Sequence, residues 1–150
     1  MLPSKSTRLD LRQLRSQTGT TNSPYIRRRQ FFAIRLGPYI FQLRLHTLFR
    51  GDSGVYAHTH PFAFWSWLIR GTYLEVVYRS PYVAITKWRN WLSLAYRSKD
   101  TVHRIAFVRN NYAVSLVLAI FDTRDPNYGK WGFLVNGKYV DHDEHLGGKA

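Results

Sequence analysis

Two histidines, His58 and His60, stand one residue apart in the stretch HTHPFAFWSWLIRGTYLE (residues 58–75). On a β-strand, side chains two positions apart point to the same face, with their Cβ atoms about 6–7 Å apart. That separation suits two nitrogen ligands of one metal ion, each at about 2.0–2.1 Å. The stretch therefore predicts a metal site, and the alternative is a histidine pair that forms hydrogen bonds in a polar barrel mouth.

A metal site needs a third ligand, and two residues further along the chain are candidates. His103 lies in DTVHRI (residues 100–105), and Glu75 closes the histidine-containing stretch. The 150-residue chain has no cysteine, which excludes disulfides, thiolate ligands and thiol catalysis. A carboxylate inside a β-barrel is costly unless it is paired or bound to a metal. Glu75 is therefore expected either outside the barrel or in the functional site.

The segments that carry these residues have the alternating pattern of short β-strands. Arg70-Gly71 predicts a two-residue hairpin turn, which would pair Ser66 with Glu75, and Asn110-Asn111 predicts another turn. Asn136-Gly137 is the strongest hairpin signal in the chain. Short strands at regular spacing indicate an all-β sandwich or barrel. Strands are expected at 39–49, 55–60, 64–69, 72–78, 82–88, 91–96, 102–108 and 112–121, with a hairpin over 130–142.

The remaining histidines and the tryptophans are less specific signals. His46 precedes the site and is expected to be a barrel histidine with its hydrogen bonds satisfied. HDEH (residues 142–145) could bind a metal, but its position near a glycine-rich end favours a solvated segment. The five tryptophans could stack on bases or sugars, although their strand positions favour packing in the core or at an interface.

A family resemblance rests on the same residues. GVYAHTHPFAFWSWLIRG (54–71) resembles the first motif of the cupin superfamily, and DTVHRI (100–105) resembles its second motif. With KWGFLVNGKYV downstream, the chain is similar to small cupin-like proteins of phage and bacterial genomes. The resemblance covers about residues 40–142. It implies an all-β, double-stranded β-helix (jelly-roll) barrel, here residues 31–146, after a basic arm (1–30) and before a short tail (147–150).

The resemblance also implies a ligand set for one divalent metal per chain. The three histidines His58, His60 and His103 match a set that some cupin dioxygenases use with ferrous iron, and Mn or Zn are alternatives. The usual glutamate of the first motif is missing, because Phe64 and Trp65 occupy its positions. Glu75 could replace that carboxylate as a ligand or as a general base. A degenerate site without metal is the alternative.

The chain is strongly basic, with a net charge of +13 and a pI of about 10.4. Residues 1–35 hold eight basic residues against the single Asp10. Such a balance favours anionic partners, and Arg27, Arg28 and Arg29 are expected to contact phosphate or carboxylate groups of nucleic acid or a neighbouring subunit. Arg104 could bind an anion at the barrel mouth. No run of 18 uncharged apolar residues occurs, so no membrane span is expected and the cytoplasm is the expected location.

Two functions follow from these features. The first is a metal-binding β-barrel protein, in its sharpest form a mononuclear Fe(II) oxygenase-type enzyme. The second is a non-catalytic structural or interaction protein, for example a phage virion component, in which the barrel is a scaffold and the arm binds neighbours, homo-oligomer partners or nucleic acid. Sequestration of a small anionic ligand without turnover is a third, weaker hypothesis.

Overall fold

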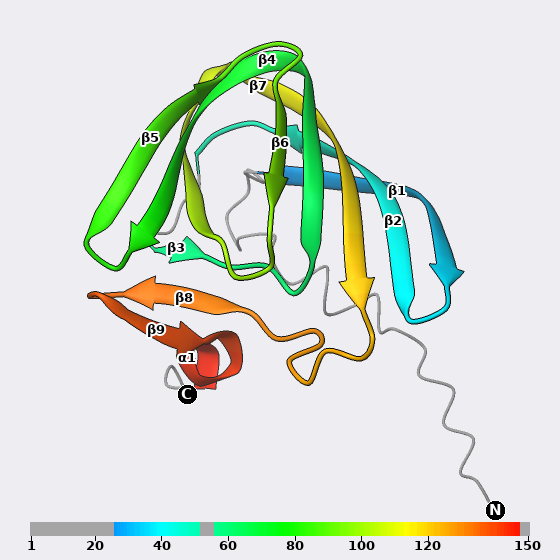
Figure 1. Cartoon of the computed structure of the whole chain (residues 1–150). Coiled ribbons are helices and arrows are strands. Elements are labelled where there is room, and N and C mark those ends of the chain that lie inside the picture. Colours follow the sequence, from blue (N-terminus) through cyan, green and yellow to red (C-terminus); the bar gives the residue numbers. More distant parts are fainter. Residues whose placement is uncertain (1–25, 52–55, 148–150) are drawn as a thin grey trace, which may run out of the picture.

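The computed structural model describes residues 26–51 and 56–147, which form a strongly bent antiparallel β-sheet (Figure 1). This confirms the predicted all-β class. The first 25 residues of the expected arm and residues 148–150 of the tail lie outside the described part. No described helix is long and apolar enough to span a membrane. The elements are β1 (Ile26–Leu36), β2 (Tyr39–Leu48), β3 (Ala57–His58), β4 (Ala63–Ser80), β5 (Val83–Arg89), β6 (Leu94–Arg97), β7 (Val102–Asp122), β8 (Gly132–Val135), β9 (Lys138–Asp141) and α1 (His142–Gly147).

Two long strands, β4 and β7, bend together and divide the sheet into two halves. The first part of β4 pairs with the second part of β7, and the second part of β4 pairs with the first part of β7. The first half-sheet has the order β1-β2-β7-β4-β6, and the second half-sheet has the order β5-β4-β7-β3-β8-β9. Figure 1 shows both long strands arching over the top, with β8, β9 and α1 below. The two half-sheets therefore enclose an interior between them.

The bend explains two turns that the sequence predicts wrongly. Gly71 has a φ of +85°, and Asn110 and Asn111 have φ values of 56° and 53°, but the chain continues as a strand on both sides of each site. A Cβ at Gly71 would collide with the backbone carbonyl oxygen of Tyr112, because β4 and β7 approach closely here. Residues that tolerate positive φ thus serve a sharp bend in a continuous strand. Asn136-Gly137, by contrast, forms the predicted hairpin between β8 and β9.

The unbroken β4 changes the partners of Glu75. The expected pairing of Ser66 with Glu75 is wrong, since Ser66 lies opposite Ala95 and Val117. Glu75 instead lies between Lys87 on β5 and Ile105 on β7. Its side chain faces the interior of the second half-sheet and is only 3% exposed. Of the two positions expected for Glu75, outside the barrel or in the functional site, the structure excludes the position outside the barrel.

The interior combines apolar packing with buried polar residues. Leu68 and Val108 are fully buried near the bend. On β2, Gln42 and Arg44 face inward, and the Nε atom of Arg44 donates to Oε1 of Gln42 at 3.1 Å. Burial, with the charge of Arg28, lowers the pKa of Arg44 to about 10. The two apolar clusters comprise Ile26, Leu48, Leu68, Tyr73, Val108 and Ala113, and Phe62, Phe64, Val117, Ala119 and Phe121.

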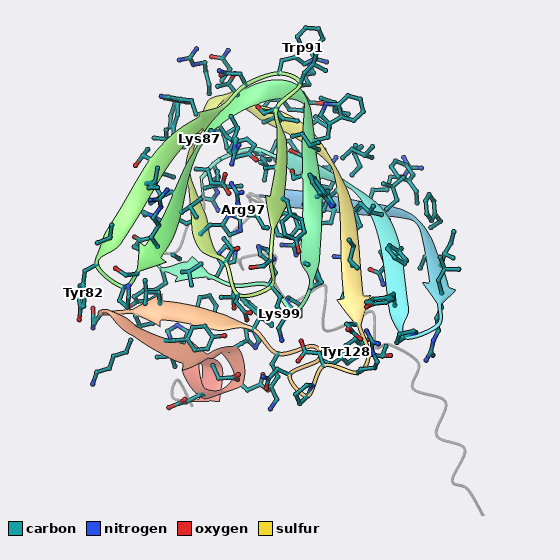
Figure 2. The ribbon with its side chains drawn as sticks, viewed as in Figure 1. Tyr82, Lys87, Trp91, Arg97, Lys99 and Tyr128 are labelled. Carbon is teal, nitrogen blue, oxygen red and sulfur yellow. The ribbon has the colours of Figure 1, made fainter. Side chains whose placement is uncertain are left out.

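The outer surface of the first half-sheet carries many large apolar side chains. Trp65 and Trp67 are each 43% exposed, so of the two expected positions, core or interface, they do not occupy the core. Trp88 and Trp91 are also exposed, and Figure 2 shows Trp91 at the top of the molecule. The strand register aligns apolar residues into two rows, one that crosses five strands and one that crosses four. We call these two rows together the outer apolar face. The rows are Phe32–Leu43–Leu118–Trp65–Tyr96 and Leu45–Leu116–Trp67–Leu94.

Candidate metal centre

Strand pairing brings the three predicted histidines to one place. His58 on β3 lies directly opposite His103 on β7, and cross-strand partners share a face of the sheet. His60 follows His58 by two residues and points the same way. The ring centroids of His58 and His60 are 5.0 Å apart, and those of His60 and His103 are also 5.0 Å apart. Three segments that are separate in sequence thus contribute one imidazole cluster.

The donor set and its spacing fit a divalent transition metal. Among the described residues, the candidate metal-ligating group consists of His58, His60 and His103, whose ligand atoms all lie within 4.8 Å of one another. The Nε2 atoms of His60 and His103 are 2.8 Å apart. Two nitrogens bound to one ion at about 2.1 Å and at right angles are about 3.0 Å apart. His58 supplies the third imidazole of this group.

The cluster is held in the protonation state that metal binding needs. Burial, followed by the charges of His103 and Arg28, lowers the pKa of His58 to about 3. Burial, together with the neighbouring His103 and His58, lowers the pKa of His60 well below its usual value. Both imidazoles are therefore neutral at pH 7, and a neutral imidazole nitrogen is the form that binds a metal.

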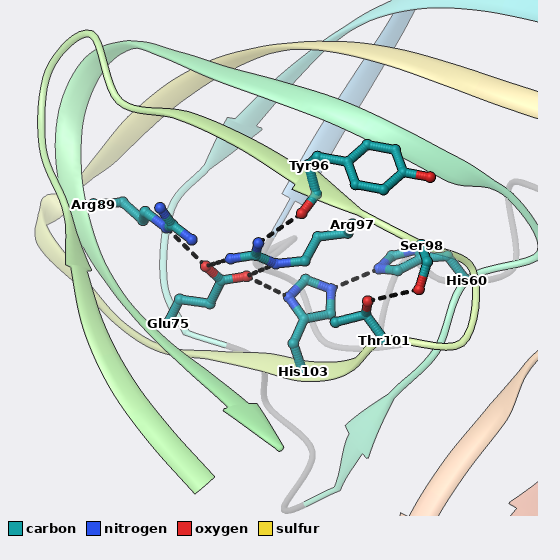
Figure 3. Close-up of polar contacts among 8 residues, drawn as sticks. All are labelled: His60, Glu75, Arg89, Tyr96, Arg97, Ser98, Thr101 and His103. Atoms are coloured by element: carbon teal, nitrogen blue, oxygen red, sulfur yellow. Dashed lines mark hydrogen bonds and ion pairs between the residues drawn. The ribbon is translucent and has the colours of Figure 1, made fainter. Parts of the chain in front are cut away.

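Glu75 contacts His103 of the cluster, at the ring nitrogen that faces away from His60, and is not itself a member of the cluster. Its Oε1 atom lies 2.8 Å from Nδ1 of His103 and 3.0 Å from Nε of Arg97 (Figure 3). Its Oε2 atom accepts from Nε of Arg89 at 2.9 Å and from a terminal nitrogen of Arg97 at 2.5 Å. Both carboxylate oxygens are thus occupied. The carboxylate is placed to orient the His103 ring, whose Nε2 faces His60.

The charge balance around Glu75 keeps it ionised. Burial alone would raise its pKa, but hydrogen bonds from His103 and Arg97 hold the pKa well below the usual range. Arg89 and Arg97 supply two positive charges against this one negative charge. An ionised Glu75 can only accept a hydrogen bond, so Nδ1 of His103 is the donor in this contact. Nε2 is then the ring nitrogen of His103 that is left to face the cluster.

Sequence reasoning did not predict Arg89 and Arg97. They lie on β5 and β6, the two strands that flank β4, and Figure 2 shows Arg97 within the barrel. Arg89 lies opposite Tyr73, which is on the same face of β4 as Glu75. That alternation would have placed Arg89 beside Glu75 if residues 63–80 had been treated as one strand. The predicted hairpin at Arg70-Gly71 concealed this signal.

Two cavities meet at the cluster. An interior cavity of about 70 Å³ is lined by the three histidines, by Arg28, and by residues of β2, β4 and β7. A second pocket of about 350 Å³ lies between the turn that precedes β7, the segment after β7, and β9. His60 lines both of them. His60 therefore lies between the interior cavity and the outer pocket.

The arginines predicted to bind anions occupy different environments. Arg27, Arg28 and Arg29 lie in β1, within the barrel sheet. Arg28 lines the interior cavity, whereas Arg27 and Arg29 are exposed. Arg104 follows His103 and lies on the other side of β7; its Nε atom is buried without a hydrogen-bond partner in the described part. The structure thus places Arg28 alone of these four at the cluster.

The C-terminal HDEH segment is solvated only in part, because Asp143 and Glu144 are exposed whereas His142 and His145 are half-buried. It forms α1, and the ring of His142 lies 4.1 Å from the ring of Trp131. The ring of His145 lies 4.9 Å from that of Phe133. Trp131 in turn makes an edge contact with His58, with ring centroids 6.4 Å apart. His142 and His145 therefore pack on Trp131 and Phe133, and neither is one of the three clustered histidines.

Several solved structures are similar to this chain at low sequence identity. One similar structure is a candidate mannose-6-phosphate isomerase from Ralstonia eutropha JMP134, at 9% identity and a TM-score of 0.52, with 65% of this chain and 86% of that chain covered. Another is a cupin 2 conserved barrel domain protein from Rhodopseudomonas palustris, at 15% identity and a TM-score of 0.48, with 63% of this chain and 59% of that chain covered. A third is a cupin domain from Bordetella pertussis Tohama I, at 10% identity and a TM-score of 0.47, with 67% and 97% covered.

These likenesses concern the fold. At identities of 9–15% they carry no information on activity or substrate. No protein-family model matches the sequence, and no curated protein sequence matches it. The fold and the site together define a bent antiparallel β-barrel with a three-histidine cluster.

Proposed function

We propose that this chain is a mononuclear metalloprotein in which His58, His60 and His103 hold one divalent metal ion. The observation that carries the proposal is the convergence of three imidazoles from separate segments, with a buried carboxylate behind one of them. Such a carboxylate–histidine arrangement is the usual support of a metal-binding histidine. A solvated or purely structural histidine has no need of a buried Glu75 and its two arginines.

Iron in the ferrous state is the first choice of metal, and Mn or Zn are the alternatives. Imidazole ligands suit iron and zinc alike, so the donor set alone permits several metals. Three protein ligands leave coordination positions free, and a metal with free positions can activate a bound small molecule and a substrate together. We propose oxygenase-type chemistry on this ground. The chain's own contribution is to keep His58 and His60 neutral and to fix the orientation of His103 through Glu75.

The first test is the metal content of the full chain purified without a polyhistidine tag. We expect about one iron, manganese or zinc per chain, and loss of that metal in a His58→Ala/His60→Ala variant. A His142→Ala/His145→Ala variant is the matched control, because it removes two histidines that pack on Trp131 and Phe133 outside the cluster. Retention of metal in the first variant, or its loss only in the second, would refute the proposed site.

A second test addresses the oxygenase-type part of the proposal. Nitric oxide binds ferrous sites that have a free coordination position, so it serves as a probe for dioxygen access. We expect the Fe(II)-loaded protein to give a ferrous–nitrosyl electron paramagnetic resonance signal, and the His58→Ala/His60→Ala variant to give none. Stoichiometric iron without any such signal would leave a metal site but contradict oxygenase-type chemistry.

A structural or interaction role is the second candidate, and the outer apolar face favours it. Trp65 and Trp67 expose large apolar surface on the outer side of the first half-sheet, which no second layer covers in the described part, and a surface of this kind marks an interface. The exposed Arg27 and Arg29 on β1 could add contacts to a neighbouring subunit or to nucleic acid. We propose copies of this chain as the first partner, since a flat apolar face is complementary to itself.

Sedimentation velocity tests this second role. We expect the wild-type chain to associate, and a Trp65→Gln/Trp67→Gln variant to sediment as a monomer. Trp91→Gln is the control, because Trp91 is 67% exposed but lies outside the outer apolar face. A monomeric wild-type chain would count against the role. Salt-sensitive DNA binding that is lost in an Arg27→Gln/Arg29→Gln variant would instead assign the basic strand to nucleic acid.

A further inference from the structure

The interior cavity contains two polar groups that the metal centre does not use. His46 on β2 and Ser115 on β7 are cross-strand partners, and both line the cavity that the three histidines also line. The Nε2 atom of His46 and the Oγ atom of Ser115 are buried and have no hydrogen-bond partner in the described part of the chain. The expectation that His46 is a fully satisfied barrel histidine is therefore wrong for this nitrogen.

Unpaired polar atoms inside a protein need an explanation. Nearly all buried polar groups have partners, and an orphaned one is destabilising unless a water molecule or a ligand completes it. Here two such atoms occur opposite each other in one cavity. Neighbouring Ser66 behaves differently, because its hydroxyl forms a hydrogen bond with Tyr73. The cavity thus has two vacant hydrogen-bonding groups beside the histidine cluster and one occupied group that serves as a comparison.

The charge of the cavity indicates what kind of ligand would occupy these groups. Its lining includes Arg28 and four histidines but no aspartate or glutamate among the described residues. The nearby carboxylate of Glu75 is already outweighed by Arg89 and Arg97. A divalent ion on the three imidazoles would therefore bring two positive charges to a cavity whose described lining holds no carboxylate. A buried site of this kind favours an anionic ligand.

The size of the cavity limits the ligand. A volume of about 70 Å³ holds several waters or a group of a few heavy atoms, such as a carboxylate with a short carbon chain. A larger molecule would have to place its remaining atoms in the adjoining pocket of about 350 Å³, which shares His60 with the cavity. A small carboxylate satisfies both the charge and the volume.

We propose that His46 and Ser115 form an anion subsite of the metal centre, where Nε2–H of His46 and Oγ–H of Ser115 donate hydrogen bonds to the carboxylate of a small ligand bound beside the metal. This inference rests on the proposed metal function. It adds two specificity-determining residues and a ligand class, the small carboxylates. Hydrogen bonds to a charged acceptor in a buried site are the strong ones, so these two residues would decide whether the anion is retained.

Acetate binding to the Co²⁺-loaded full chain tests the inference. The visible absorption of Co²⁺ reports both that the metal is bound and that an anion has changed its surroundings. We expect acetate to shift this spectrum in the wild-type protein. In His46→Phe and in Ser115→Ala the dissociation constant for acetate should rise about tenfold or more, with the Co²⁺ content unchanged. His46→Gln, which keeps a donor, should show a smaller rise.

Ser66→Ala is the matched control, since it removes a hydroxyl from the same cavity that already has a partner. It should bind acetate like the wild type. Acetamide, which has the shape of acetate without its charge, should bind at least tenfold more weakly than acetate to the wild type.

The outcomes separate the two proposals. A wild-type chain that binds no Co²⁺ would overturn the metal centre itself. Full Co²⁺ occupancy with unchanged acetate affinity in both His46→Phe and Ser115→Ala would overturn the anion subsite alone, and would assign the two polar atoms to ordered waters. An equal loss of affinity in Ser66→Ala would also overturn it, because a general change of the cavity would then account for the effect.

Discussion

The carboxylate of Glu75 and the imidazole of His103 face each other across the pair β4–β7, with Oε1 and Nδ1 2.8 Å apart. The opposite nitrogen of the same ring, Nε2, lies 2.8 Å from Nε2 of His60. His103 therefore connects a buried charged network on one side with the histidine cluster on the other. Changes to the network should be measurable at the cluster.

The first prediction concerns Glu75→Gln. The amide cannot hold the Nδ1 proton of His103 as strongly, so metal affinity should fall by about 10–100-fold. The same change leaves Arg89 and Arg97 without their counter-charge and should lower the free energy of unfolding by about 3 kcal/mol. Competition with a chelator measures the first effect and urea unfolding the second. Glu144→Gln, on exposed α1, is the control, and equal metal affinity in Glu75→Gln and wild type would contradict the role of Glu75.

The second prediction separates a buried two-bond ion pair from an exposed one. Arg97 contacts both oxygens of Glu75, and Arg124 contacts both oxygens of Asp122. Lysine keeps the charge but loses the planar pair of donors. Arg97→Lys should therefore lower the free energy of unfolding by about 1–2 kcal/mol, whereas Arg124→Lys should cause no measurable change because its pair is solvated. Similar effects of both variants in urea unfolding would show that burial does not decide the outcome.

The third prediction concerns pH and the metal-free protein. Burial lowers the pKa of His46 and His60 well below 6.5, and that of His58 to about 3. These residues stay neutral in the folded chain, while in the unfolded chain they take up protons as the pH falls below about 6.5. Their contribution to the free energy of unfolding is therefore complete above that pH. Below it, stability is lost progressively, for His58 down to about pH 3.

The size of this effect follows from the number of protons involved. Each histidine can contribute a slope of up to about 1.4 kcal/mol per pH unit. Urea unfolding at pH 7.5, 6.5 and 5.5 measures it. A free energy of unfolding that stays constant from pH 7.5 to 5.5 would mean that these histidines take up protons in the folded chain as they do in the unfolded chain.

The fourth prediction tests the bend in β4. Gly71→Ala places a Cβ against the carbonyl oxygen of Tyr112 at a φ of +85°, so it should lower the free energy of unfolding by about 3 kcal/mol or prevent folding. Gly37→Ala is the control, since Gly37 has a φ of +59° but open space around its Cβ position. It should cost only about 1 kcal/mol. Equal losses in thermal or urea unfolding would show that β4 and β7 do not approach closely at Gly71.

Local patterns in the sequence are sufficient for part of the fold and site. The spacing of His58 and His60 predicts their shared face, and Asn136-Gly137 predicts its hairpin, because both depend on residues next to each other in the chain. Arg70-Gly71 and Asn110-Asn111 mislead, since a positive φ serves a bend as well as a turn. The surroundings of Glu75 are predictable only in part. Alternation places Arg89 beside Glu75 once residues 63–80 are treated as one strand, whereas the position of Arg97 depends on the pairing of β6 with the other half of β4.

The sequence pattern also does not predict which face of a strand points into the barrel. Alternation along β2 separates Gln42, Arg44 and His46 from Phe41, Leu43 and Leu45. It does not say which set faces inward, and general experience favours the apolar set. In the structure the polar set faces inward, and His46 therefore lines the cavity. The role proposed for His46 therefore depends on tertiary structure rather than on its sequence context.

The continuous pairing of β7 with strands from both halves of the chain has a kinetic consequence. Tyr39 on β2 pairs with Asp122, and His60 and His103 are 43 residues apart in sequence. Contacts between residues so far apart require closure of long loops, and chains rich in them fold on timescales of milliseconds to seconds. The histidine cluster exists only after β7 has joined β3. Metal capture by a nascent or refolding chain would thus be a late event that reports completed assembly of the barrel.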